Sequence, residues 1–156
     1  MQWIKREESL YCILNSTLRK EKRDLLKLWF LHLKLILKSL AKLPSIEGRT
    51  FYRGDKFNLS DIYRPGKIIV WWDFSSCTST INVLGEEKIL DKTDMPTLFA
   101  IECKSAKDIR LRSMYFDENE ILSLPAAQFK VVGQYQPSEH VCMFQLKELY
   151  PLQHSI

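Results

Sequence analysis

Apolar residues recur at helical spacing through the first third of the chain. One set falls on a single helical face and consists of Leu10, Ile13, Leu14 and Leu18. A second and longer set follows: Leu26, Trp29, Phe30, Leu33, Ile36, Leu37 and Leu40. Pro44 is expected to end the second helix, because residues before a proline avoid the helical region. The pattern predicts two helices whose apolar stripes face a core, with polar Asn15 as the odd residue near the first stripe.

After Pro44, short apolar runs separated by turn residues replace the helical period. They are Thr50–Tyr52, Lys67–Trp72, Thr97–Cys103, Gln128–Val132 and Val141–Leu149. In the last run apolar Cys142, Phe144 and Leu146 alternate with Met143, Gln145 and Lys147, as in a half-buried strand. Segments 54–66 and 81–96 are expected to be surface loops or short helices. We therefore predict one α+β domain, in which a helical region (residues 1–46) packs on a mainly antiparallel β core (residues 47–150).

Length and composition fit a single folded domain. The chain has 156 residues, of which 46% are hydrophobic and 27% charged, the ordinary mix of a globular protein. The net charge of +4 is unevenly distributed, since residues 1–50 carry 11 Lys and Arg against 5 Asp and Glu. Such a basic half can bind nucleic acid or acidic lipid. We favour the simpler interpretation of a solvated helix face, because the lysines lie opposite the apolar stripe, at Lys27, Lys34, Lys38 and Lys42.

The remaining composition argues against a metal site and a membrane span. The cysteines Cys12, Cys77, Cys103 and Cys142 are scattered and lack zinc-ligand spacing, so we expect buried free thiols and no metal. The first residues show no secretory signal, and lysines interrupt the most apolar stretch, which would make it a poor bilayer span. These features favour a cytoplasmic protein without a membrane span, and we expect a monomer.

A pair of carboxylates stands near the C-terminus. Glu118 and Glu120 are separated by one residue and lead into apolar Ile121-Leu122, so an extended backbone would put both acids on one side. A fixed carboxylate can stabilise the positive charge that develops on a sugar carbon when its C–N bond breaks, while the second acid assists deprotonation of a guanidinium nucleophile. The alternative is a solvated acidic turn.

Two further segments carry polar residues at strand ends. Arg53 leaves the run Phe51-Tyr52 and precedes Gly54, so its guanidinium could hold a phosphate where backbone approaches a ligand. Ser75 and Ser76 follow an apolar strand, and their hydroxyls could bind a sugar or orient a carboxylate. The alternatives are a strand end followed by a turn, and a serine-rich turn.

With these motifs in this order, the chain resembles an arginine-specific mono-ADP-ribosyltransferase of the arginine–serine–glutamate class. The resemblance extends from about Leu10 to Leu149. The family arginine matches Arg53 within Phe51-Tyr52-Arg53-Gly54. The family Glu-x-Glu, followed by an apolar pair and proline, matches 118–125. The serine falls on Ser76 if Phe74 is the aromatic anchor, but Cys77 stands where a hydroxyl residue is usual, which leaves Ser75 and Ser76 open.

The resemblance implies a fold and a set of roles. The fold would be helices leading into a two-sheet β core that forms a cleft for NAD, which is a substrate. Arg53 would bind the NAD phosphates, Gly54 would lie near the nicotinamide, and Ser75 or Ser76 would complete the site. Glu120 would be the catalytic acid and Glu118 would select arginine as acceptor. The helical region is short for the family, which is consistent with a truncated chain.

Three functions follow from these observations. The leading hypothesis is transfer of ADP-ribose from NAD to an arginine-bearing protein, with release of nicotinamide and no nucleic-acid partner. The nearest alternative is an NAD glycohydrolase, in which water is the acceptor. The third is a non-catalytic module whose basic helices bind nucleic acid or an acidic partner. The aromatic residue that stacks on the nicotinamide is left open between Tyr52, Trp72 and Phe74.

Overall fold

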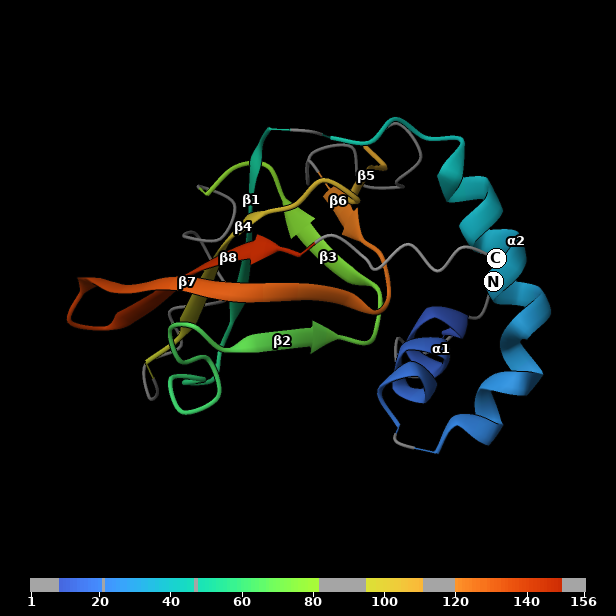
Figure 1. Ribbon diagram of the computed structural model, residues 1–156, viewed down its shortest axis with the longest axis horizontal. Coiled ribbons are helices and arrows are strands. Elements are labelled where there is room, and N and C mark those ends of the chain that lie inside the picture. The colour runs from blue at the N-terminus through green and yellow to red at the C-terminus, as the bar shows by residue number, and fades with distance from the viewer. Residues whose placement is uncertain (1–8, 21, 47, 82–94, 111–119, 150–156) are drawn as a thin grey trace, which may run out of the picture.

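The computed structural model describes residues 9–20, 22–46, 48–81, 95–110 and 120–149. Helices precede the strands (Figure 1). The first is α1 (Leu10–Arg19), which begins at Ser9, whose hydroxyl accepts a hydrogen bond from the backbone N–H of Cys12. Such a cap satisfies one of the free N–H groups in the first turn. None of the helices in these ranges has the length and apolar character needed to span a bilayer.

The second predicted helix is divided in two. Its first half is the 3-10 helix η2 (Arg23–Trp29), and its second half is α2 (Phe30–Ala41), which ends before Pro44. Five positions of the predicted stripe pack on a cluster with Leu14, Leu18 and Phe74; they are Leu26, Trp29, Leu33, Ile36 and Leu40. Phe30 and Leu37 are exposed, against our prediction, and so are Leu10 and Ile13 of the first stripe. Phe30 and Leu37 each follow an inward residue by one position, about 100° further round the helix, so they turn away from the core.

The strands form one eight-stranded sheet in the order β2-β7-β8-β4-β1-β3-β6-β5. Their bounds are β1 (Thr50–Asp55), β2 (Ile68–Trp71), β3 (Ser75–Thr78), β4 (Thr97–Glu102), β5 (Lys107–Asp108), β6 (Glu120–Ser123), β7 (Ala127–Ser138) and β8 (Val141–Glu148). The pairing of β4 with β8 is parallel and the other pairings are antiparallel. The mixed α+β class predicted from the sequence is therefore observed.

The expectation of two sheets is not confirmed, because hydrogen bonding joins all eight strands. The junction between β1 and β3 is narrow and consists of the pair Tyr52–Thr78. On one side of it β1 pairs with β4 over six residues, and on the other β3 pairs with β6 over four. Runs of apolar residues cannot reveal such a junction, because it depends on one residue pair far apart in sequence.

Three local predictions are corrected or limited by the structure. Ser75 and Ser76, for which the sequence left a serine-rich turn as the alternative, belong to strand β3. Met143, predicted on the wet side of β8, is buried in a small cluster with Leu98 and Ala100 on the sheet. Of the segments predicted as loops or short helices, residues 54–55 belong to β1 and residues 56–66 contain neither helix nor strand, while residues 82–94 lie outside the described ranges.

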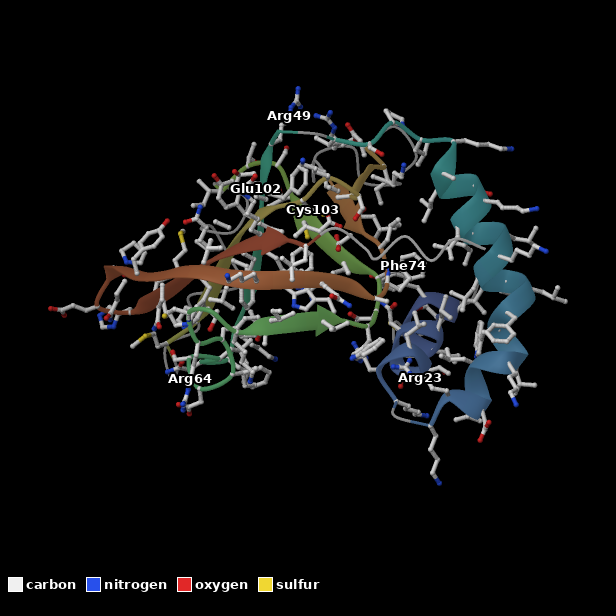
Figure 2. All side chains as sticks on the ribbon, viewed as in Figure 1. Arg23, Arg49, Arg64, Phe74, Glu102 and Cys103 are labelled. Carbon is white, nitrogen blue, oxygen red and sulfur yellow. The ribbon has the colours of Figure 1, made fainter. Side chains whose placement is uncertain are left out.

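The main core lies on the strands, and a second apolar cluster joins the sheet to the helices. Phe51, Phe99, Phe129 and Phe144 are almost fully buried in the main core. Phe74, labelled in Figure 2, lies at the end of the sheet that faces α1 and α2. Because Phe74 directly precedes β3, packing of this ring fixes where β3 starts relative to α1.

Candidate active site

A cleft of about 470 Å³ lies where α1 approaches the junction of β1, β3 and β6. Its walls combine polar and aromatic side chains from those elements: Tyr11, Cys12, Asn15, Arg19, Tyr52, Arg53, Gly54, Asp73, Phe74, Ser76, Cys77, Thr78 and Glu120. Four of the predicted site residues, Arg53, Gly54, Ser76 and Glu120, therefore meet in one cavity. A concave site of this size with a few convergent polar groups is typical of small-molecule binding.

Strand register brings the serine and the carboxylate together. Thr78 of β3 pairs with Tyr52 of β1 on one side and with Glu120 of β6 on the other. Ser76 lies two residues before Thr78, so its side chain emerges on the same face of β3 and diagonal to Glu120. The Ser76 hydroxyl donates a hydrogen bond of 2.7 Å to Glu120 Oε1. That bond holds one carboxylate oxygen and orients the other.

The two neighbouring serines have different environments. Ser76 is exposed to the cleft, whereas Ser75 is 2% exposed and its hydroxyl donates a long hydrogen bond of 3.4 Å to Asp73 Oδ1. Ser75 does not line the cleft. Of the two residues that the sequence left open, Ser76 has the geometry to contact a bound molecule and Glu120 together.

Arg53 is held over an aromatic ring. Its guanidinium carbon lies 5.6 Å from the centre of the Trp71 ring, a distance typical of a cation–π contact. Trp71 is itself fixed, because its indole N–H donates a hydrogen bond of 2.8 Å to the Tyr63 hydroxyl. Trp71 therefore restricts the position of the Arg53 side chain at the cleft, and Arg53 stays partly exposed to solvent.

Of the three candidate aromatics, Tyr52 and Phe74 line the cleft, whereas Trp72 does not. The Trp72 ring instead lies under the guanidinium of Arg23, 4.3 Å from ring centre to carbon. The candidates for stacking on a bound ring are thereby reduced to Tyr52 and Phe74.

Sequence reasoning missed the contribution of α1 to the site. The Asn15 side chain accepts a 3.0 Å hydrogen bond from the Phe74 backbone N–H and donates one of 3.1 Å to the Phe74 carbonyl. The Tyr11 hydroxyl also donates to that carbonyl, at 3.1 Å, and Arg19 forms a 2.8 Å ion pair with Asp73. These contacts fasten the segment before Ser76 to the helix. The signal in the sequence was Asn15, a polar residue beside an apolar stripe.

Two groups at the cleft, the buried Cys77 thiol and the Tyr11 hydroxyl, stay protonated at neutral pH. Burial raises the pKa of the Cys77 thiol to about 12, although the nearby charge of Arg53 acts in the opposite direction. Partial burial of its hydroxyl raises the pKa of Tyr11, although the residue is 47% exposed, against the lowering effects of its hydrogen bond with Asn15 and the charge of Arg53. Cys77 is therefore a poor nucleophile here, since reactivity requires the thiolate.

Glu118, the first acid of the predicted pair, lies outside the described residues, as do the other positions between 111 and 119. Within the ranges that the structure describes, there is no group of three or more His, Cys, Asp or Glu side chains that could hold a metal ion.

Known structures share this arrangement of helices and strands. Vis from Vibrio splendidus, an ADP-ribosyltransferase solved with agmatine, superimposes with a TM-score of 0.69 and 20% identity, over 89% of this chain and 68% of Vis. The ADP-ribosyltransferase HopU1 of Pseudomonas syringae pv. tomato gives a TM-score of 0.73 and 24% identity, over 90% of this chain and 65% of HopU1. The chain has the ADP-ribosyltransferase fold. Exoenzyme S from Pseudomonas aeruginosa, solved with human 14-3-3 protein beta and carba-NAD, gives a TM-score of 0.63 and 19% identity, over 88% of this chain and 66% of that one.

The sequence is far more divergent than the fold. No protein-family model matches the sequence, and no curated protein sequence matches it significantly. The chain spans about two thirds of the length of the three structures described above. At 24% identity or less the likeness establishes the ADP-ribosyltransferase fold, and the case for an activity rests on the geometry of the cleft.

Proposed function

We propose that this protein transfers ADP-ribose from NAD to an arginine side chain and releases nicotinamide. The observation that carries the proposal is the hydrogen bond from Ser76 to Glu120 in a cleft that also contains Arg53 and Gly54. The fold supports it, because structures that share the fold include one solved with agmatine and one with carba-NAD. Residues 1–156 would then form a single catalytic domain.

Each side chain has a defined task in this reaction. The bond between the ribose and the nicotinamide nitrogen breaks, and its electron pair leaves with neutral nicotinamide. Positive charge develops on the ribose carbon in the transition state. The Glu120 carboxylate, oriented by Ser76, stabilises this transition state more strongly than the ground state. Arg53 holds the pyrophosphate with paired donors from its supported guanidinium. Gly54 lets the nicotinamide lie against the main chain, and Tyr52 or Phe74 stacks on its ring.

The choice of acceptor depends on Glu118, the other acid of the pair. Attack by an arginine guanidinium on the ribose carbon releases one proton, and the proposal assigns that proton to Glu118. An extended backbone around residues 118–120 would present both acids on one side. The agmatine complex of Vis is consistent with an arginine-like acceptor, because agmatine carries the same guanidinium group. The proposed acceptor is therefore an arginine side chain of a protein.

The proposal is tested by incubating the protein with NAD and agmatine and measuring both nicotinamide and ADP-ribosyl-agmatine. Glu120→Gln should lower both products on the order of a hundredfold or more, because it removes the charge that stabilises the transition state. The matched control is Glu102→Gln, which removes an exposed carboxylate from β4 outside the cleft and should leave both products unchanged. Wild-type rates in Glu120→Gln would reject the proposed role of this acid.

A second variant separates transfer from hydrolysis. Glu118→Gln should lose transfer to agmatine but keep nicotinamide release with water as acceptor, since only the guanidinium needs that base. Equal loss of both products would contradict the division between the two acids. Nicotinamide release that never yields ADP-ribosyl-agmatine, even in the wild-type protein, would identify an NAD glycohydrolase instead.

A further inference from the structure

Large apolar side chains face solvent along the outermost helical layer. Leu28, Leu31 and Leu35 are 79%, 77% and 66% exposed. They follow one another at spacings of three and four residues and so share one side of η2 and α2. Figure 1 shows α2 at the end of the molecule, with the sheet on its inner side. That inner side is already used, because Leu33, Ile36 and Leu40 pack there on the cluster around Phe74.

Lysines accompany these leucines on the outward side. Lys34, Lys38 and Lys42 are spaced four residues apart, and all three are exposed. No ion pair involving them occurs within the described ranges, whereas Lys27 lies 3.6 Å from Asp24. The sequence of α2 contains no acidic residue. We call the six residues Leu28, Leu31, Leu35, Lys34, Lys38 and Lys42 the leucine–lysine face.

We propose that the leucine–lysine face binds the surface of an anionic lipid bilayer. A helix with leucines and lysines on its free side can lie in the interface, with the leucines entering the acyl region and the lysines reaching the headgroups. The lysine stems are long enough to bury their methylenes beside the leucines while the ammonium groups stay at the lipid phosphates. The protein would lie on the bilayer without spanning it, which is consistent with the short helices of the described ranges.

Charge and shape favour a bilayer over other occupants. Two copies of the chain docked through this face would bring lysine rows together with no carboxylate of α2 between them. Nucleic acid would use the lysines but would leave the three exposed leucines in water. A planar anionic surface accommodates both kinds of side chain along the outward side of a helix at the end of the molecule (Figure 1).

The test is co-sedimentation of the full chain with vesicles of phosphatidylcholine mixed with phosphatidylserine, compared with pure phosphatidylcholine. We expect binding to the mixed vesicles that weakens with salt. The triple variant Lys34→Gln, Lys38→Gln, Lys42→Gln should bind about a hundredfold more weakly, at roughly tenfold or less per lysine. The triple variant Leu28→Ser, Leu31→Ser, Leu35→Ser should also lose binding. It should keep the wild-type far-UV circular dichroism, because the three side chains contact solvent rather than the core.

Controls match each change in kind but lie elsewhere on the chain. Lys56→Gln, Lys67→Gln and Lys130→Gln remove the same charge from exposed positions outside the helices. Ile68→Ser with Val132→Ser removes exposed apolar side chains from β2 and β7. Both controls should bind like the wild type. The proposal is overturned by absence of binding to anionic vesicles, by equal binding of the leucine variant, or by a concentration-dependent dimer that the leucine variant abolishes.

Discussion

The Ser76 hydroxyl lies 2.7 Å from Glu120 Oε1, although 44 residues separate the two along the chain. The bond depends on the pairing of Thr78 with Glu120, which sets β3 and β6 in register. A shift of one residue would send Ser76 to the other face of the sheet. Register between two short strands thus determines the geometry of the proposed catalytic carboxylate.

Removing the Ser76 hydroxyl tests this relationship. Ser76→Ala should lower kcat for nicotinamide release about ten- to a hundredfold, because hydrogen bonds to charged groups contribute about 1.5–3 kcal/mol. The matched control is Ser75→Ala, which removes the neighbouring hydroxyl outside the cleft and should affect kcat far less. Steady-state kinetics with NAD measures both. A larger loss in Ser75→Ala than in Ser76→Ala would reverse the assignment.

Arg53 should act on NAD binding rather than on the chemical step. Arg53→Lys should raise KM for NAD about tenfold with a smaller change in kcat, because lysine cannot copy the paired donors or the planar contact with Trp71. The control is Arg64→Lys, at an exposed position outside the cleft that Figure 2 labels. An unchanged KM in Arg53→Lys would remove the arginine from the phosphate site.

Much of the architecture could be predicted from the sequence because burial leaves a periodic trace. Helical spacing marks α1 and the inward residues of α2, and apolar runs mark β1, β2, β4, β7 and β8. Strand β3 was not among the predicted apolar runs, because its residues are polar or small. Such residues suit a strand of which one face lines a cleft. Phe30 and Leu37 were wrongly predicted to face the core, since apolar character alone does not show which side of a helix packs against another element.

The candidate site was predictable only to a limited extent. Arg53, Ser76 and Glu120 stood out because their residue types and order resemble a known family. Tyr11, Asn15 and Arg19 did not, because their roles arise from contacts with Asp73 and Phe74, more than 50 residues away. A polar residue near an apolar helix face indicates a buried hydrogen bond but does not reveal its partner.

Asn15 should stabilise the protein through its two hydrogen bonds with the Phe74 backbone. Asn15→Ala leaves both backbone groups without this partner in a buried site, so the free energy of unfolding should fall by about 1–3 kcal/mol. Asn58→Ala is the control, because Asn58 is exposed and accepts hydrogen bonds from nearby Ser60, so its effect should be smaller than that of Asn15→Ala. Urea unfolding measures both. Equal stability of the two variants would show that the Asn15 contact contributes little.

Cys77 should make the protein sensitive to alkaline conditions. Burial raises the pKa of its thiol from the ordinary 9.0 to about 12, so above pH 9 the unfolded chain loses this proton before the folded protein does. The unfolded state then binds fewer protons, and stability falls as pH rises. The contribution of this thiol is fully present below pH 9 and is lost progressively towards pH 12.

Cys77→Ala should therefore show a shallower loss of stability above pH 9 than the wild type, whatever its stability at neutral pH. Unfolding in urea at a series of pH values gives the slope for each protein. Cys12→Ala is the control, since that thiol is only partly buried. Parallel curves for the wild type and Cys77→Ala would show that the Cys77 thiol titrates alike in the folded and unfolded states.

The most direct test of the proposed function is a crystal structure with carba-NAD, the analogue bound in the exoenzyme S structure. We predict that the carbocyclic ring that replaces the ribose beside the nicotinamide lies against Ser76 and Glu120, the pyrophosphate against Arg53, and the nicotinamide against Tyr52 or Phe74. A dinucleotide bound outside the cleft, or a cleft that stays empty at saturating carba-NAD, would contradict the proposal.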